Sequence, residues 1–428
     1  MKMKKTQKYI LLSLAALLSL AGCDRGDIAF GDFDDLSWRE GANLKAFKVI
    51  SVKETDLSEG LPEDCYVPEG EIQDPETKTT CTNVNNLVQS IFEFNQKSKV
   101  IEIAGTYKSW DILTEKETTL SGKILLPKGR KPKRYIVVSH YTIGSNAECP
   151  SNCFPIEGVL CHLGYAMIFP DYEGYGVDSG RVHPYLMLQQ TAMDVYNMYE
   201  AASKFLENTD YAPEEEKIYL MGFSQGGAVT MATQWYIESY MGIGELVGQV
   251  FAGGGPYDVR ATYNNFIETD KVNIPAAVPL IVQGMIVGNN MSIKMEDLLQ
   301  GWVYEKIDDW INSKKYTVLQ LKEMMGTTKT SDILTEEGMD PTSDVVSELY
   351  KVMSENSILA FNWTPTAPVY MLHSMDDDVV PFVNASKAKV QWKDANIQYN
   401  FGHYGSHTSA AMRFIFSVRT WLKENEGK

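Results

Sequence analysis

The chain has 428 residues, of which 44% are hydrophobic and 22% are charged. These values are ordinary for a soluble globular protein, and they exclude a disordered chain, a fibrous repeat and a multi-span membrane protein. The length suits one large domain that carries an insertion. The formal net charge of −17 gives an acidic surface that repels nucleic acid and anionic lipid headgroups, so we expect no nucleic-acid partner.

The first 22 residues have the composition of an export signal. A segment with four lysines precedes the apolar run Tyr9–Ala21, which is too short to cross a membrane as a helix. The run ends in Leu20-Ala21-Gly22-Cys23, which resembles a bacterial lipobox. The resemblance implies cleavage before Cys23, a diacylglyceryl group on its sulfur, and attachment to the bacterial envelope. We expect the outer membrane or the cell surface rather than the inner membrane; an ordinary signal peptide is the alternative.

Five cysteines remain beyond Cys23. In an exported protein they can form disulfides, and we expect Cys65 to pair with Cys81, and Cys149 with Cys153 or Cys161, which leaves one free thiol. A zinc site built from the last three cysteines and His162 is the less favoured interpretation, because the spacing is irregular.

The order of the predicted elements indicates an α/β fold. Residues 23–98 are acidic and turn-rich, and we expect a tether followed by a small extension. Two β-rich runs then flank a turn, and they predict an antiparallel hairpin. Short, almost continuously apolar runs follow, with helical periodicity between them, as in a mostly parallel sheet that helices cover on both faces. The hairpin runs are Val100–Tyr107 and Thr118–Leu126; the later strands are Arg134–Ser139, Tyr165–Pro170, Lys217–Met221, Leu246–Ala252 and Pro368–Leu372; the helices are Tyr185–Glu207 and Gln225–Tyr240.

The stretch 260–362 interrupts this alternation, because its apolar pattern is mostly helical and strand signals return only at Pro368. A helical insertion placed late in a parallel sheet is typical of a lid or cap. We therefore divide the core into residues 99–259 and 363–428, with the insertion between them.

The motif Gly222-Phe223-Ser224-Gln225-Gly226 carries the clearest chemical signal. It follows a predicted strand and precedes a predicted helix, where a sharp turn would hold the Ser224 hydroxyl clear of the backbone and close to main-chain donors. The N-terminus of that helix would also stabilise a forming oxyanion. We interpret Ser224 as a nucleophile.

With these residues, the sequence resembles the α/β-hydrolase superfamily from about Val100 to the C-terminus. The loop Pro170–Gly176 and the segment His140-Tyr141-Thr142 resemble two of its loops, and Pro368–Pro381 resembles the strand and turn that bear its acid. The long insertion is most similar to that of secreted lipases and esterases with a helical lid.

The superfamily order of serine, acid and histidine implies a base after Ser224. His373, His403 and His407 follow the serine, and His373 precedes every acid of the next turn. The place of His407 between an apolar run and a helix matches the family histidine, with His403 as the alternative.

The resemblance also implies the acid and the oxyanion hole. Through Val380 and Pro381, the family's D-x-x-V-P pattern selects Asp377, with Asp376 and Asp378 as alternatives. The oxyanion hole should pair the backbone N–H of Gln225 with that of Tyr141 or Thr142.

We therefore expect a serine hydrolase that cleaves a carboxylic ester through an acyl-enzyme and requires no metal or organic cofactor. The partner is a small-molecule ester or a short peptide. A serine peptidase or amidase would use the same residues, and a binding lipoprotein that has lost catalysis is the non-enzymatic alternative.

Overall fold

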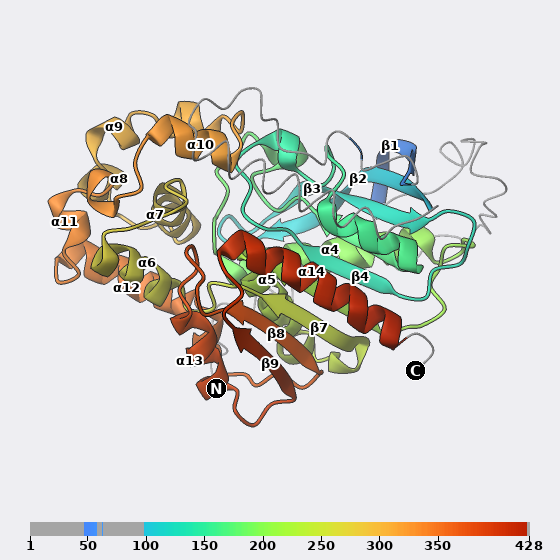
Figure 1. The fold of residues 1–428 in the computed structure, drawn as a ribbon. Helices are drawn as coiled ribbons and strands as arrows, with labels where there is room; N and C mark the ends of the chain where they lie inside the picture. Colours follow the sequence, from blue (N-terminus) through green and yellow to red (C-terminus); the bar gives the residue numbers. More distant parts are fainter. Residues whose placement is uncertain (1–46, 58–61, 63–97, 426–428) are drawn as a thin grey trace, which may run out of the picture.

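A nine-stranded sheet forms the centre of the protein (Figure 1). The structure is a computed structural model, and it describes residues 47–57, 62 and 98–425. The strand order is β1-β2-β3-β5-β4-β6-β7-β8-β9. The bounds are β1 Phe47–Asp56, β2 Lys99–Asp111, β3 Lys116–Pro127, β4 Tyr135–Ser139, β5 Ala166–Pro170, β6 Ile218–Phe223, β7 Val247–Gly253, β8 Val369–Ser374 and β9 Ile397–Gly402.

The sheet is antiparallel at its N-terminal edge and parallel elsewhere. β1, β2, β3 and β5 pair antiparallel in succession, and every pair from β5 through β4 to β9 is parallel. The predicted hairpin is the β2–β3 pair, and the five later predicted strands are present within a few residues of their expected bounds. The predicted α/β-hydrolase fold class is confirmed.

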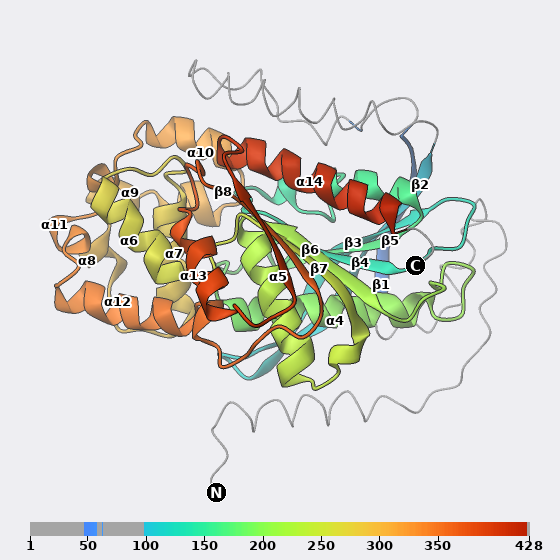
Figure 2. The ribbon, with the colours of Figure 1, turned by 60° about the horizontal axis from the view of Figure 1, so that its bottom comes forward.

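Helices cover both faces of the sheet, as predicted. Along β4, Tyr135 and Val137 enter one buried cluster, whereas Ile136 and Val138 enter a second cluster on the opposite face. This alternation follows from the two-residue period of a strand. Figure 2 shows α14 on one side of the sheet and α4 and α5 on the other. Their bounds are α4 Leu188–Leu206, α5 Gln225–Trp235 and α14 His407–Glu424.

The segment between β7 and β8 is helical, and it forms a body beside the C-terminal ends of the parallel strands (Figure 1). Within the described residues it contributes no strand to the nine-stranded sheet. Its longer helices are α6 Val259–Thr269, α7 Ala277–Gly288, α10 Val318–Met325 and α12 Asp344–Glu355, with shorter helices at α8 Met295–Leu298, α9 Gly301–Tyr304 and α11 Glu336–Met339.

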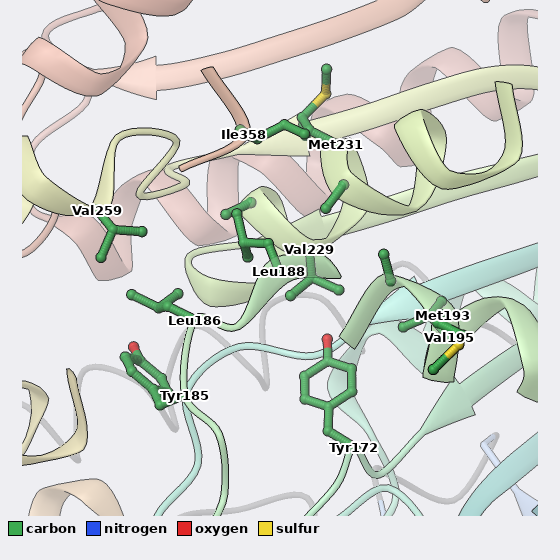
Figure 3. Close-up of a cluster of buried hydrophobic side chains, with 14 of the residues drawn as sticks. Tyr172, Tyr185, Leu186, Leu188, Met193, Val195, Val229, Met231, Val259 and Ile358 are labelled. Carbon is green, nitrogen blue, oxygen red and sulfur yellow. The ribbon is translucent and has the colours of Figure 1, made fainter. Parts of the chain in front are cut away.

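The helical body and the sheet share one hydrophobic cluster. Val278 of α7 and Leu349 of α12 belong to the same buried cluster as Ile168 of β5 and Val229 of α5. Figure 3 shows part of this cluster, with Tyr172, Tyr185 and Val259 among its labelled side chains. The insertion is therefore packed into the core and does not stand apart from it.

Several predictions for the N-terminal segment lie outside the described residues, namely the signal segment, the lipid site at Cys23, and Cys65 with Cys81. β1 was not anticipated, because it lies in the stretch expected to be tether and extension. Most of its side chains are exposed or half-buried, so this edge strand has no continuous apolar run to identify it. Among the described residues, no helix has both the length and the apolar character needed to span a membrane.

The expected pairing of Cys149 is not formed. Cys149 and Cys161 are free thiols. The Cys149 thiol donates a hydrogen bond to Asn146 Oδ1 at 3.2 Å, whereas Cys161 is packed in the apolar cluster beneath α14. No group of three or more potential metal ligands occurs in the described part of the chain.

Candidate active site

Ser224 stands on a strained turn between β6 and α5. Its backbone has φ 60° and ψ −128°, which a non-glycine residue adopts only when its surroundings force it. The Ser224 N–H donates to the carbonyl of Gly253 at the end of β7, at 2.9 Å. The turn therefore holds Ser224 at the C-terminal edge of the parallel sheet, as the motif predicted.

Close backbone packing explains the glycines around Ser224. A Cβ atom on Gly222 would lie 2.4 Å from the Gly226 carbonyl oxygen, and one on Gly226 would lie 2.0 Å from the Ser139 carbonyl oxygen. Both separations are shorter than real atoms tolerate. Glycine at these positions lets the turn pass directly beside the end of β4, where the predicted oxyanion loop begins.

Asp377 and His407 are in direct contact. The Asp377 Oδ2 atom lies 2.7 Å from His407 Nδ1, and Asp377 Oδ1 accepts the backbone N–H groups of Val379 and Val380 at 3.0 and 2.8 Å. The Asp377 side chain is fully buried. Burial alone would raise the pKa of this carboxyl, but the His407 and His373 rings and the Val379 amide outweigh burial and lower the pKa.

The His407 ring packs against the turn that carries Ser224. The ring centroid lies 4.8 Å from that of Phe223, the residue immediately before the serine. His407 Nε2 is buried and has no hydrogen-bond partner among the described residues. Since the ionised Asp377 can only accept, Nδ1 carries the proton of the neutral ring, and Nε2 keeps a lone pair that can take a proton.

The alternative bases and acids have other partners. His403 pairs with Asp376 at 2.8 Å on the surface, where their side chains are 73% and 46% exposed. His373 lies behind Asp377, with Nε2 3.0 Å from the Val380 carbonyl oxygen, and burial lowers its pKa. These contacts favour Asp377 and His407 as the catalytic pair.

Asp378 holds the loop that carries the histidine. Its Oδ1 atom accepts the His407 backbone N–H at 2.9 Å, and its Oδ2 atom accepts the Asn273 side-chain amide at 3.0 Å. Asn273 lies between α6 and α7. Asp378 therefore connects the insertion to the backbone of His407.

The predicted oxyanion loop follows β4, and side-chain contacts of His140 and Thr142 hold it in place. His140 Nδ1 lies 2.6 Å from the Tyr141 carbonyl oxygen, and its ring stacks on Tyr172 at a centroid distance of 3.8 Å. The Thr142 hydroxyl is 2.7 Å from the Tyr185 hydroxyl. Tyr141 is 41% exposed, so its bulky side chain is partly in solvent.

Two further contacts lie close to the site, and only the loop-bracing role of Asp171 was expected from the sequence. Asp171 accepts from Ser121 Oγ at 2.6 Å and from the Ser151 N–H at 2.9 Å, which fixes the loop after β5. His183 contacts the Gln225 side chain. No local signal identifies that second contact, because the two residues are 42 positions apart.

Known structures resemble this chain in fold. The esterase LipA from Xanthomonas oryzae, described as rice cell wall degrading, is 19% identical, with a TM-score of 0.65, and the match covers 78% of this chain and 92% of LipA. A protein of Legionella pneumophila is 16% identical, with a TM-score of 0.67, and the match covers 81% of this chain and 95% of that protein. Candida antarctica lipase A is 16% identical, with a TM-score of 0.54 and coverage of 74% of each chain. A comparison with curated protein sequences finds no match.

The sheet order and the turn at Ser224 define an α/β-hydrolase. The family model of the secretory lipases matches residues 152–424, which is more than half of the chain. The chain belongs to the secretory lipase family and is a hydrolase that acts on carboxylic esters. Membership of this family indicates an exported protein.

Proposed function

We propose that this enzyme cleaves its ester through an acyl-enzyme formed on Ser224. The observation that carries the proposal is the buried pair of Asp377 and His407: the His407 ring packs against Phe223, next to the strained turn, and its Nε2 has no hydrogen-bond partner among the described residues. His407 takes the proton of the Ser224 hydroxyl as the oxygen attacks the carbonyl carbon. The base then gives this proton to the departing alcohol, and a water molecule repeats the sequence to release the acid.

The negative charge of each tetrahedral intermediate needs main-chain donors. Gln225 is the first residue of α5, and its N–H has no acceptor within the helix. The N–H of Tyr141 or Thr142 supplies the second donor. Thr142 is favoured because the contact of its hydroxyl with Tyr185 holds this residue of the loop in place. The helices from α6 to α12 serve as the lid over this edge of the sheet.

Trapping of the acyl-enzyme tests the mechanism. We expect a fluorophosphonate to modify one residue of the purified full chain, Ser224, as seen by peptide mass spectrometry. With a p-nitrophenyl ester, rapid mixing should release about one equivalent of p-nitrophenol before the steady rate. An adduct on another residue, or the absence of both adduct and burst in an enzyme that still cleaves esters, would contradict the proposed nucleophile.

We also propose that the enzyme is anchored to the bacterial envelope by a lipid on Cys23. The support is the order of lysines, apolar run and small residues before this cysteine. In a bacterial host that processes lipoproteins, the wild type should sediment with membranes and release with detergent, whereas Cys23→Ser should lose the lipid mass and leave the membrane fraction. A Cys161→Ser variant is the matched control; identical fractionation and mass for wild type and Cys23→Ser would rule the anchor out.

A further inference from the structure

A buried contact joins the residue after Ser224 to a histidine that the proposed mechanism does not use. His183 Nε2 lies 3.0 Å from Gln225 Nε2, and the two residues are only 2% and 1% exposed. Gln225 therefore makes two contributions. Its backbone N–H is the proposed oxyanion donor, and its side chain contacts the His183 imidazole.

The proton positions of this contact follow from its partners. His183 Nδ1 lies 2.7 Å from the Glu173 carbonyl oxygen, which can only accept, so Nδ1 must carry a proton. Burial lowers the pKa of His183 to about 3, so the ring is neutral and Nε2 keeps its lone pair. The Gln225 carboxamide must then donate its N–H to Nε2, which fixes the orientation of the amide.

The ring of His183 has little room to move. It packs against Tyr175 at a centroid distance of 4.8 Å and against Tyr185 at 5.8 Å. Its backbone passes so close to Gly174 that a Cβ atom there would lie 2.6 Å from the His183 Cα. Tyr185, on the other side, contacts the Thr142 hydroxyl. The surroundings of His183 thus reach both segments that would supply the oxyanion donors.

We propose that His183 is a positioning residue for the oxyanion hole, and that it acts through the Gln225 side chain. The inference rests on the proposed function. By holding the carboxamide, His183 fixes the first residue of α5, so that the Gln225 N–H stays aimed at the oxygen that becomes negative in the transition state. A donor aligned for the transition state contributes more to kcat than to substrate binding.

A pair of amide substitutions separates positioning from simple packing. In His183→Asn, the side-chain amide lies where Nδ1 was, so it can still donate to Glu173 but cannot reach Gln225. In His183→Gln, the amide lies where Nε2 was, so it can accept from Gln225. We expect kcat to fall roughly tenfold to a hundredfold in His183→Asn with KM changed less than threefold, because loss of one whole donor costs about 10²- to 10³-fold. His183→Gln should exceed His183→Asn in kcat by at least threefold.

Gln225→Met provides a second test. It removes the side-chain amide that donates to His183, and it leaves the histidine and the Gln225 backbone N–H in place. We expect kcat in the double variant Gln225→Met/His183→Asn to fall no further than in the worse of the two single variants. The reason is that both substitutions break the same contact. Equal kcat values in His183→Asn and His183→Gln, or additive losses in the double variant, would overturn the inference. Thermal unfolding of each variant sets an assay temperature at which all are folded. Failure of the proposed nucleophile is a separate result, since it is read from Ser224 in the wild-type enzyme.

Discussion

Replacing Ser224 with alanine should lower kcat for ester hydrolysis by about five orders of magnitude, with little change in KM. The variant keeps the oxyanion donors and the substrate contacts but has no oxygen to attack the carbonyl carbon. Serine hydrolases that lose this oxygen keep only the part of catalysis that binding and the oxyanion hole provide. Because the residual rate is low, it should be measured with a high concentration of enzyme and a rigorously purified sample.

Ser203→Ala is the matched control for this experiment. Ser203 lies on α4, where its hydroxyl donates to the Glu200 carbonyl oxygen at 3.0 Å, and it is not one of the proposed site residues. We expect its kcat to stay within twofold of the wild type. If Ser224→Ala retained more than a tenth of the wild-type kcat, another residue would be the nucleophile.

Replacing Asp377 with asparagine should lower kcat by about four orders of magnitude. The Val379 and Val380 N–H groups bind Asp377 Oδ1, so they will select the carbonyl oxygen of the asparagine amide. Its NH₂ group then faces His407 Nδ1 and must donate to it. The neutral ring is forced into the tautomer with its proton on Nε2, which cannot accept the proton of Ser224. Steady-state kinetics at neutral pH measure the loss.

Asp376→Asn tests whether this loss is specific to one carboxylate. Asp376 is adjacent in sequence, yet it pairs with the exposed His403 instead of His407. We expect a loss of less than threefold, because an exposed pair contributes little. If Asp376→Asn and His403→Gln were the damaging substitutions while Asp377→Asn was tolerated, the acid and base would be assigned to the surface pair.

The parallel strands were predictable because both of their faces are buried. A strand covered on each side must be apolar at almost every position, and that pattern is visible without any knowledge of its neighbours. The turn at Ser224 was predictable for a related reason, since glycines crowded against Ser139 and Gly226 leave a local signature. β1 lacked both signals, because it is an edge strand with few buried side chains.

Contacts between distant segments could not be predicted. The partners of the three consecutive acids, Asp376, Asp377 and Asp378, are fixed by how β8, β9 and the insertion meet, and only the family pattern distinguished among them. The same holds for Cys149. Its spacing to Cys153 and Cys161 suggested a disulfide, whereas the folded loop directs its thiol to Asn146.

The hydrophobic cluster that runs from the sheet into the insertion has a consequence for folding. Residues of α7 and α12 complete the same buried surface as residues of β5 and α5, so neither part can unfold alone without exposing the other to water. The insertion and the sheet therefore form one cooperative unit. Opening of the proposed lid would then require rearrangement of individual helices and loops rather than release of the whole insertion.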